Sequence, residues 1–575
     1  MHRRRHQAEE SDQGIPAWAR LECLPNPAND RSSFNPNLAL AASVRLGLHP
    51  RSCILQNPAR NTPKEMRMAT NHDAGSQSAD DARVLQSMGY KQELSRSMKP
   101  FSNFAISFSI ICILSGGINS LNQGIAGVGG AAIGIGWIVG SAVCLIFALG
   151  MAQIGSAFPT AGGLYHWGSI LGNVGIGWVT AWLNLIGLVT VLGAINIGTY
   201  SFFIGAFGPS LGLADTFTTK MIFMVLITGS QALFNHLGIR LTTKLTDLSG
   251  YLIIGGAVLM FVLFMSYAKE WDFSRLWTFT NYSGLPEGAA VWPKTDSLMF
   301  VFLLGLLLPI YTITGYDASA HTAEETVDAS RSVPKGMVNS VIWSALFGWL
   351  MLCAFVLAIP DMAEGAKQGW GIFFWTSDQV LPQTWKQILY VVVVVSQYLC
   401  GLATVTSASR MIFAFSRDGG LPGSGALRAV SPKYRTPVAA IWASAVLAVL
   451  FTSYAEWYAV IVSVTVIFLF LSFTVPIFFG LLAHGKTWTK MGPWDMGPKY
   501  KIVAILCVLA MILILVIGIQ PPSDKALNIT IAFFILTAIV WFGFERRRFK
   551  GPPQGVMIQQ RAAEIDKAER AVGEK

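Results

Sequence analysis

Two adjacent glycines interrupt an otherwise apolar stretch of the sequence, at Ser115-Gly116-Gly117. A helix that breaks in lipid frees backbone N–H and C=O groups, and each is costly unless the protein satisfies it. Glycine eases such a break and lets a ligand approach the backbone. We therefore expect the N–H groups of Gly116, Gly117 and Ile118 to open a second half-helix and to suit a carboxylate. The alternative role of these small residues is to let two helices pack closely.

A second interruption, Thr314-Gly315-Tyr316, divides an apolar stretch in the second half of the chain. Carbonyl groups that end the first half-helices, near Leu114 and near Ile313 and Thr314, suit an ammonium group. A zwitterionic amino acid would match both polarities at once. Two glycine-interrupted segments in corresponding positions are typical of an inverted-repeat transporter and indicate where its substrate binds.

Aromatic residues flank the second interruption. Tyr311 lies four residues before Gly315, so a helix places it one turn back on the same face. Tyr311, Tyr316 and Trp182 are the aromatic residues placed to line a cavity beside the interruptions. They could pack a substrate's side chain or enclose a quaternary ammonium group by cation–π contact.

Asp317 follows two residues after Gly315. An ionisable group at membrane depth is costly and is a functional candidate by default, here as a proton site or as the partner of a cation. The alternative is a helix N-cap for the second half of the segment. One residue can fill both roles.

Further along this segment, His321, Glu324 and Glu325 approach the next loop. We expect them to form ion pairs with Arg410 or Arg417 that act as a gate, rather than to bind substrate. The apolar segments contain no paired histidines, Ser-His pair or carboxylate cluster of the kind that an enzyme would use, and no metal site is expected.

The composition places these residues in a membrane protein. Of 575 residues, 53% are hydrophobic and only 13% are charged, against roughly 25% charged in a soluble domain. Apolar runs of about 20 residues recur, the length of a membrane-spanning helix, and they exclude a β-barrel of short alternating strands. The seven cysteines form no Cys-x-x-Cys pair and read as small residues facing lipid or core.

The apolar runs predict an all-α protein with twelve spans. The predicted spans are 101–128, 131–151, 174–206, 219–238, 245–268, 297–327, 337–359, 385–415, 437–454, 456–482, 501–520 and 526–545. Lysine and arginine concentrate in every second connection and after the last span, which places both termini in the cytosol.

The spans group into larger units. Residues 86–268 form a first repeat, residues 297–482 form a second, inverted repeat, and residues 501–545 add two helices before a cytosolic tail over 546–575. Residues 1–85 are polar and carry Arg3-Arg4-Arg5. They are expected to be a disordered cytosolic tail, or an over-extended start with translation beginning at Met66 or Met68.

Three motifs resemble the amino acid–polyamine–organocation superfamily. The sequence Gly-Tyr-Asp-Ala-Ser-Ala-His-Thr-Ala-Glu-Glu-Thr (315–326), followed by Val-Pro-Lys (333–335), is similar to its sixth-helix signature. Ala-Phe-Pro-Thr-Ala-Gly-Gly-Leu-Tyr (157–165) is similar to the loop after its second helix, and residues 410–422 are similar to the exit of its eighth helix. The first motif most resembles the amino acid/choline branch, which includes γ-aminobutyrate and choline permeases.

The resemblance implies a LeuT-like five-plus-five inverted repeat with broken first and sixth helices. It also implies plasma-membrane location (the inner membrane in a bacterium) and uptake of an amino acid or small amine by alternating access. The binding residues it implies are Ser115, Gly116, Gly117, Tyr311, Thr314, Gly315 and Tyr316. Gln153 departs from the pattern, because many relatives have an acidic residue there.

The driving ion stays open between H⁺ and Na⁺. Asp317 is the proton candidate, and hydroxyls of Thr406 and Ser407 are candidates for a sodium site, although small residues packing between helices explain most such hydroxyls better. No cofactor and no nucleic acid are expected, only a small-molecule substrate and the lipid bilayer; the sequence leaves the oligomeric state open. The competing hypothesis is a membrane sensor or scaffold that binds the same ligands without transport.

Overall fold

The structure is a computed structural model, and it describes residues 80–287, 290–454, 458–553 and 558. The predictions for residues 1–79 lie outside these residues. The described residues belong to one compact unit that spans Ala69–Lys575. Their regular structure is helical, apart from two isolated bridges, Met98 with Thr326 and His484 with Trp488. The predicted all-α fold class is confirmed.

Ten helices in the described part of the chain are long and apolar enough to cross a membrane, and two shorter apolar segments lie among them. The long elements are α3 with α4 (Pro100–Ile111, Ile113–Asn119), η1 with α6 (Ala132–Gly136, Trp137–Ala157), α8 (Val174–Leu211), α9 (Phe217–His236), α10 (Ile239–Tyr267), α14 (Ala329–Ala358), α17 (Gln383–Arg417), α20 (Tyr458–Ala483), α21 (Lys499–Gly518) and α22 with η5 and α23 (Lys525–Val540, Trp541–Glu545, Arg546–Arg548). The shorter segments are α11 with α12 (Leu298–Gly305, Leu307–Thr312) and α19 (Val438–Tyr454). Twelve spans remain the prediction.

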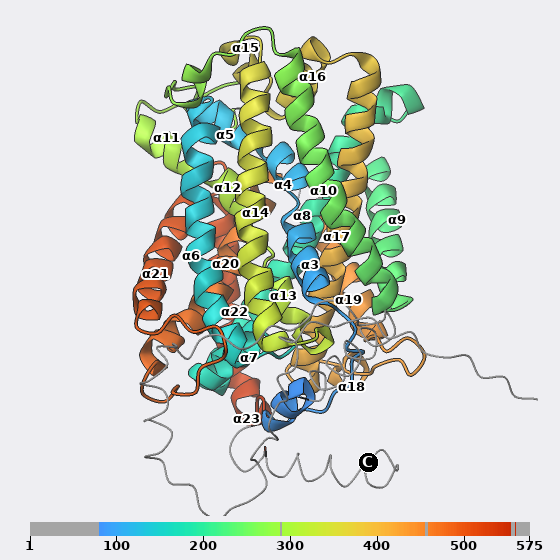
Figure 1. The fold of residues 1–575 in the computed structure, drawn as a ribbon, viewed down its shortest axis with the longest axis vertical. Coiled ribbons are helices and arrows are strands. Elements are labelled where there is room, and N and C mark those ends of the chain that lie inside the picture. The colour runs from blue at the N-terminus through green and yellow to red at the C-terminus, as the bar shows by residue number, and fades with distance from the viewer. Residues whose placement is uncertain (1–79, 288–289, 455–457, 554–557, 559–575) are drawn as a thin grey trace, which may run out of the picture. The chain divides into compact units, whose positions relative to one another are not determined.

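Short helices cap the two ends of the bundle (Figure 1). One end carries α7 (Leu164–Leu171), α18 (Ser424–Leu427) and α23. We call it the basic end, because Arg417, Arg428 and the three arginines of α23 lie there. The opposite end carries α5 (Leu121–Val128), α15 (Met362–Lys367) and α16 (Ile372–Val380).

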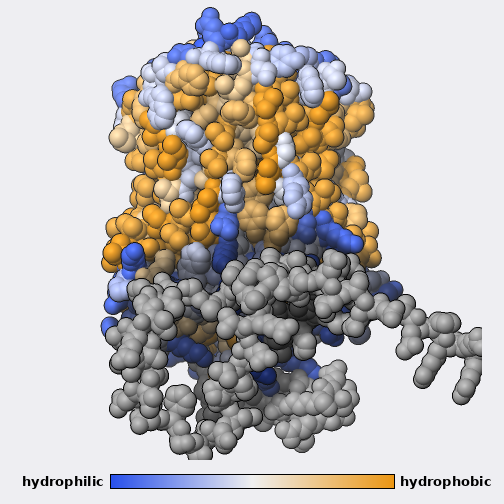
Figure 2. Space-filling view, viewed as in Figure 1, coloured by the Kyte–Doolittle hydropathy of each residue, from blue (hydrophilic) through white to orange (hydrophobic). Residues whose placement is uncertain are grey.

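The outer surface is apolar between these ends. Figure 2 shows a band of hydrophobic side chains with hydrophilic ones beyond it at both ends. Large apolar side chains on α21 and α22, such as Ile512 and Leu536, are more than half exposed at 57% and 61%. Soluble proteins rarely expose apolar surface on this scale, whereas lipid covers it without cost.

The first predicted span is interrupted earlier than expected. The helix ends at Ile111, Cys112 has a positive φ of 29°, and α4 begins at Ile113. The predicted interruption at Ser115-Gly116-Gly117 is therefore wrong in position, and these residues lie inside α4. Gly116 serves close packing instead, because a Cβ there would lie 2.9 Å from Cα of Thr312 in α12.

The sixth predicted span is divided by an irregular stretch over residues 313–317, where the expected interruption lies. The helix α12 ends at Thr312, and α13 (Ala318–His321) and η3 (Ala323–Glu325) follow it. Gly315 has a φ of 92°, a backbone conformation that residues other than glycine rarely adopt. The glycine thus supplies the turn that an L-residue with a side chain would resist.

Two segments predicted as tails contain packed structure. Residues 80–87 are helical, and the carboxylate of Asp81 accepts hydrogen bonds from the N–H groups of Asp328 and Ala329. Beyond α23, the Phe549 ring is buried against Tyr165 and Phe415. The predicted disorder is therefore wrong for residues 80–85, because contacts distant in sequence order them, and the cytosolic tail over 546–575 stays a prediction.

Candidate functional site

A small cavity of about 10 Å³ lies between the two interruptions, which is room for about one water molecule. It is lined by Ile110, Ile111, Ser115, Gly116, Val191, Ile195, Tyr311, Thr312, Thr314 and Cys400. Four of the predicted binding residues, Ser115, Gly116, Tyr311 and Thr314, are in its wall. Gly117, Ile118, Gly315 and Tyr316 are not among its lining residues. All of the lining residues are uncharged.

Polar groups of the cavity wall bond mainly to nearby backbone. The Cys400 thiol donates to the Ile110 carbonyl at 3.2 Å, and the Thr314 hydroxyl donates to the Tyr311 carbonyl at 2.7 Å. The N–H groups of Ser115 and Gly116 donate to the Cys112 carbonyl at 2.7 and 3.1 Å. The expectation that the Gly116 N–H is freed is therefore wrong in this conformation, because α4 begins one turn earlier than predicted.

Gly315 shapes the cavity from behind its wall. A Cβ at Gly315 would lie 2.2 Å from Cγ2 of Ile110, which lines the cavity. The Tyr316 side chain does not line the cavity but packs against the Phe473 ring, with ring centroids 5.4 Å apart. The backbone carbonyl of Tyr316 accepts a hydrogen bond from the Ser107 hydroxyl. Trp182 also lies elsewhere, against the Phe415 ring.

Asp317 is fully buried beside two polar side chains. Its Oδ2 accepts from Nδ2 of Asn184 on α8 at 3.1 Å and lies 3.2 Å from Nε2 of His321, one turn along α13. Its Oδ1 has no hydrogen-bond partner among the described residues. Asp317 occupies the N-cap position of α13, as the alternative predicted, but its side chain makes no capping hydrogen bond there. His321 was expected to pair with an arginine, and that expectation is wrong, because the next helical turn places it against Asp317.

The two predicted glutamate–arginine pairs are present. Arg410 binds Glu325 through Nε and Nη2, both at 3.0 Å, and both side chains are 0% exposed. Arg417 binds Glu324 through Nη1 and Nη2, also at 3.0 Å. Two-pronged pairs of this kind fix geometry as well as charge. They join the segment after α13 to the end of α17.

The sodium-site candidates on α17 differ in their surroundings. The Thr406 hydroxyl donates to Oδ1 of Asn235 on α9 at 2.7 Å, so its proton is already engaged. The Ser407 hydroxyl is buried and has no partner within the described structure. Gln153 donates to Asp495 at 2.9 Å and accepts from the Met496 N–H at 2.7 Å, which ties α6 to the loop before α21.

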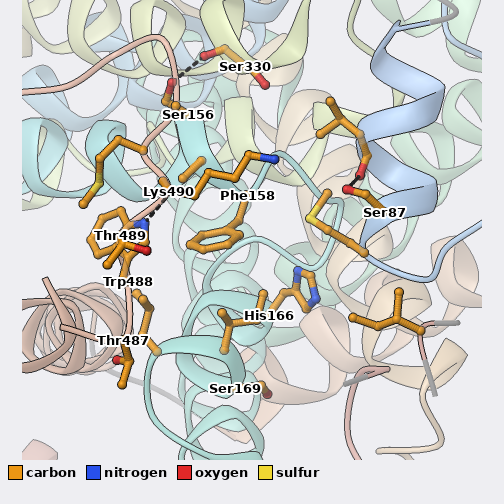
Figure 3. Close-up of a pocket in the computed structure, with 18 of the residues that line it drawn as sticks. Ser87, Ser156, Phe158, His166, Ser169, Ser330, Thr487, Trp488, Thr489 and Lys490 are labelled. Carbon is orange, nitrogen blue, oxygen red and sulfur yellow. Dashed lines mark hydrogen bonds between the residues drawn. The ribbon is translucent and has the colours of Figure 1, made fainter. Parts of the chain in front are cut away.

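A larger cavity of about 910 Å³ lies at the basic end (Figure 3). Its wall includes Ser87, Phe158, His166 and Lys490, and none of the predicted substrate residues. Burial, and then the charge of Arg417, lowers the pKa of His166 to about 3, so this imidazole is neutral at physiological pH. Sequence reasoning missed this cavity, because its walls come from connections without a distinctive pattern.

Comparison with known proteins settles the family. The sequence model of the amino acid permease family matches residues 98–544. The chain belongs to this family. It is 31% identical to the amino-acid permease BAT1 of Arabidopsis thaliana, over 82% of this chain and 96% of that protein. It is 26% identical to the GABA-specific permease of Saccharomyces cerevisiae, over 84% of this chain and 87% of that protein.

A solved structure of a Na⁺-coupled sialic acid symporter also aligns with this permease, over 79% of this chain and 97% of that one, at a TM-score of 0.45 and 12% identity. The superfamily resemblance of the three motifs is confirmed by the family match. The protein is a multi-pass membrane permease with a small-molecule substrate, and not an enzyme.

Proposed function

We propose that this permease imports an amino acid or small amine across the plasma membrane by alternating access, driven by an ion gradient. The observation that carries this proposal is the cavity between the two helix interruptions. Four of the residues expected to bind substrate line it, although they come from segments that are far apart in the sequence. Backbone that is irregular at membrane depth is tolerated where it lines such a site.

The chemistry of the cavity wall favours a substrate without net charge. Its side chains are uncharged, and a buried ion without a partner would be costly. Carbonyl groups where α3 and α12 end suit the ammonium group of such a substrate, and Val191 and Ile195 of α8 offer apolar surface to its apolar part. Neutral α-amino acids and γ-aminobutyrate fit this description better than polyamines with several positive charges.

Transport requires the cavity to enlarge, because about 10 Å³ cannot hold an amino acid. The buried pairs Arg410–Glu325 and Arg417–Glu324 join two segments at the basic end, which supports a role as the gate on that side. We propose that this end faces the cytosol, since positive residues favour the cytosolic side. Opening of the gate then releases substrate into the cell.

Asp317 supports proton coupling. A carboxylate and an imidazole lie 3.2 Å apart here, both fully buried, and ionisable groups at membrane depth commonly form proton relays in transporters. The unpartnered Oδ1 of Asp317 leaves a position for a proton. Thr406 and Ser407 stay candidate sodium ligands, because a hydroxyl that donates its proton to Asn235 still offers oxygen lone pairs to a cation.

The experiment pairs binding with accumulation. Purified protein is screened by thermal shift against neutral amino acids, γ-aminobutyrate, choline and polyamines, since a ligand at 100 times its Kd stabilises the fold by about 2.7 kcal/mol. Labelled ligands that shift the transition are then tested for uptake into vesicles under an inward proton gradient. We expect Asp317→Asn to keep binding and to lose the dependence of uptake on the gradient. Binding without accumulation by the wild type favours the alternative, a membrane sensor.

A further inference from the structure

Residues 80–98, which we call the strap, run along the chain that follows α13. The Gln92 side chain donates to the Glu324 carbonyl at 2.8 Å. The N–H groups of Ser97 and Met98 donate to the Glu325 carbonyl at 2.9 and 2.8 Å. The strap therefore contacts the backbone of both glutamates whose side chains form the proposed gate.

The start of the strap is attached to the same region. The Asp81 carboxylate accepts from the N–H groups of Asp328 and Ala329 at 2.7 and 3.0 Å, where α14 begins. A carboxylate is favourable at the N-terminus of a helix. Arg96 lies 3.4 Å from Asp81 and donates to the Thr326 carbonyl at 2.8 Å. Both ends of the strap are thus held by residues 324–329.

Between these attachments, Tyr90 reaches the other side of the gate. Its hydroxyl donates to Oδ2 of Asp418 at 2.7 Å, and the Arg417 guanidinium lies 3.8 Å from its ring centroid. Burial, and then the charge of Asp418, raises the pKa of the Tyr90 phenol well above its usual value, so the phenol stays a donor at neutral pH. Arg417 is therefore held by Glu324 and by the Tyr90 ring together.

We propose that Tyr90 is a further positioning residue of the gate, which holds the end of α17 against the strap and must release it each time the gate opens. The inference rests on the proposed function in one respect, that this gate opens during transport. The contacts of the strap with residues 324–329 stay on one side of the gate. The contacts of Tyr90 with Arg417 and Asp418 cross it, so among the contacts of the strap these are the ones that opening breaks.

The surroundings of the strap fit this movement. Val84, Ser87 and Met88 form part of the wall of the 910 Å³ cavity (Figure 3). One side of the strap therefore borders open space rather than packed side chains. Tyr90 itself is buried, with its ring edge-on to that of His166, which lines the same cavity.

The test measures gate opening directly. A reporter cysteine is placed by Ala320→Cys on α13, a position only 1% exposed in the closed structure. Its alkylation by a membrane-impermeant maleimide applied from the side of the basic end is followed in the full-length protein. The variants Tyr90→Phe and Tyr90→Ala are compared with Ser87→Ala as the matched control, because the Ser87 hydroxyl donates to the Val84 carbonyl within its own helix. The parent without the reporter measures background labelling.

We expect Tyr90→Phe to raise the alkylation rate about tenfold, which corresponds to about 1.4 kcal/mol, because it removes one hydrogen bond to a charged acceptor. Tyr90→Ala should raise it further, and Ser87→Ala should leave it unchanged. Equal rates in wild type, Tyr90→Phe and Tyr90→Ala, with unchanged melting temperatures, overturn the inference. The alkylation rate reports on the gate whether or not the wild type accumulates substrate, so failure of the proposed function is recognised separately, by absent uptake.

Discussion

Gly116 and Gly117 are neighbours in α4, yet the structure gives them different tasks. A Cβ at Gly116 would lie 2.9 Å from both Cα and Oγ1 of Thr312 and 3.0 Å from its Cγ2. A Cβ at Gly117 would make an ordinary contact, 3.4 Å from Cε of Met351. Only the first glycine keeps two walls of the cavity in close approach. Gly116→Ala should therefore impair transport, and Gly117→Ala should not.

The expected size of the Gly116→Ala effect follows from two opposing contributions to the free energy. Alanine in place of glycine inside a helix favours folding by about 0.8–1 kcal/mol. Overpacking a close contact costs about 1–3 kcal/mol, and the atoms that Gly116→Ala meets include backbone of α12, which cannot rotate away. The net cost of about 0–2 kcal/mol acts on the close approach of α4 to α12, so we expect Gly116→Ala to weaken substrate binding by up to roughly 30-fold, because each 1.4 kcal/mol is a factor of about ten. Gly117→Ala should be neutral or slightly stabilising.

The assay is uptake of a labelled substrate into proteoliposomes, with KM and maximal rate measured for both variants beside thermal unfolding of the purified proteins. A selective rise in KM for Gly116→Ala, with a melting temperature close to the wild type, is the expected result. Equal loss in both variants would mean that α4 tolerates no added methyl group, and normal KM in both would mean that this wall does not contact substrate. Either result refutes the assignment of Gly116 to the site.

Three further predictions concern the surroundings of the site. Gly315→Ala should destabilise the fold by about 1–3 kcal/mol from its positive φ alone, with more from the clash with Ile110, and should lower uptake; unchanged thermal unfolding would contradict the strain. Arg410→Met should cost about 3–5 kcal/mol by leaving the buried Glu325 unpaired, and adding Glu325→Gln should recover much of it; a double variant no more stable than the single one would contradict this. His166 has a pKa lowered to about 3 by burial and Arg417, so its contribution to stability is full above pH 6.5 and is lost as pH falls. Between pH 8 and 5 the free energy of unfolding of the wild type should fall by about 2 kcal/mol more than that of His166→Gln. Parallel pH profiles of thermal unfolding for the two proteins would contradict this.

The helices of this permease were predictable because each needs a long apolar run to cross a membrane, and such runs are visible without knowledge of packing. The two glutamate–arginine pairs were also predictable, since their charges stand near the ends of apolar segments. The pairing of Asp317 with His321 had a signal that was not used, because residues four apart share a helix face. That spacing would have removed His321 from the gate.

Other features depend on contacts that no local pattern contains. The break at Cys112 rather than at Gly116 follows from how α4 packs on Thr312 of α12, far away in the sequence. Residues 80–85 of the strap were assigned to a polar tail, and residues 86–98 to the start of the first repeat without a predicted structure. The order of the strap comes from hydrogen bonds to residues 324–329 and from the contact of Tyr90 with Arg417. A polar segment has no apolar periodicity from which its packed structure could be predicted.

Accumulation of a zwitterionic substrate by the reconstituted protein tests the central claim most directly. Full-length permease in proteoliposomes, given a labelled neutral amino acid or γ-aminobutyrate and an inward proton gradient, should concentrate the label above its external level. A protonophore should abolish the concentration, and Gly116→Ala should reduce uptake while Gly117→Ala should not. A ligand that stabilises the protein in thermal shift but never accumulates in the vesicles, with or without the gradient, would contradict the account.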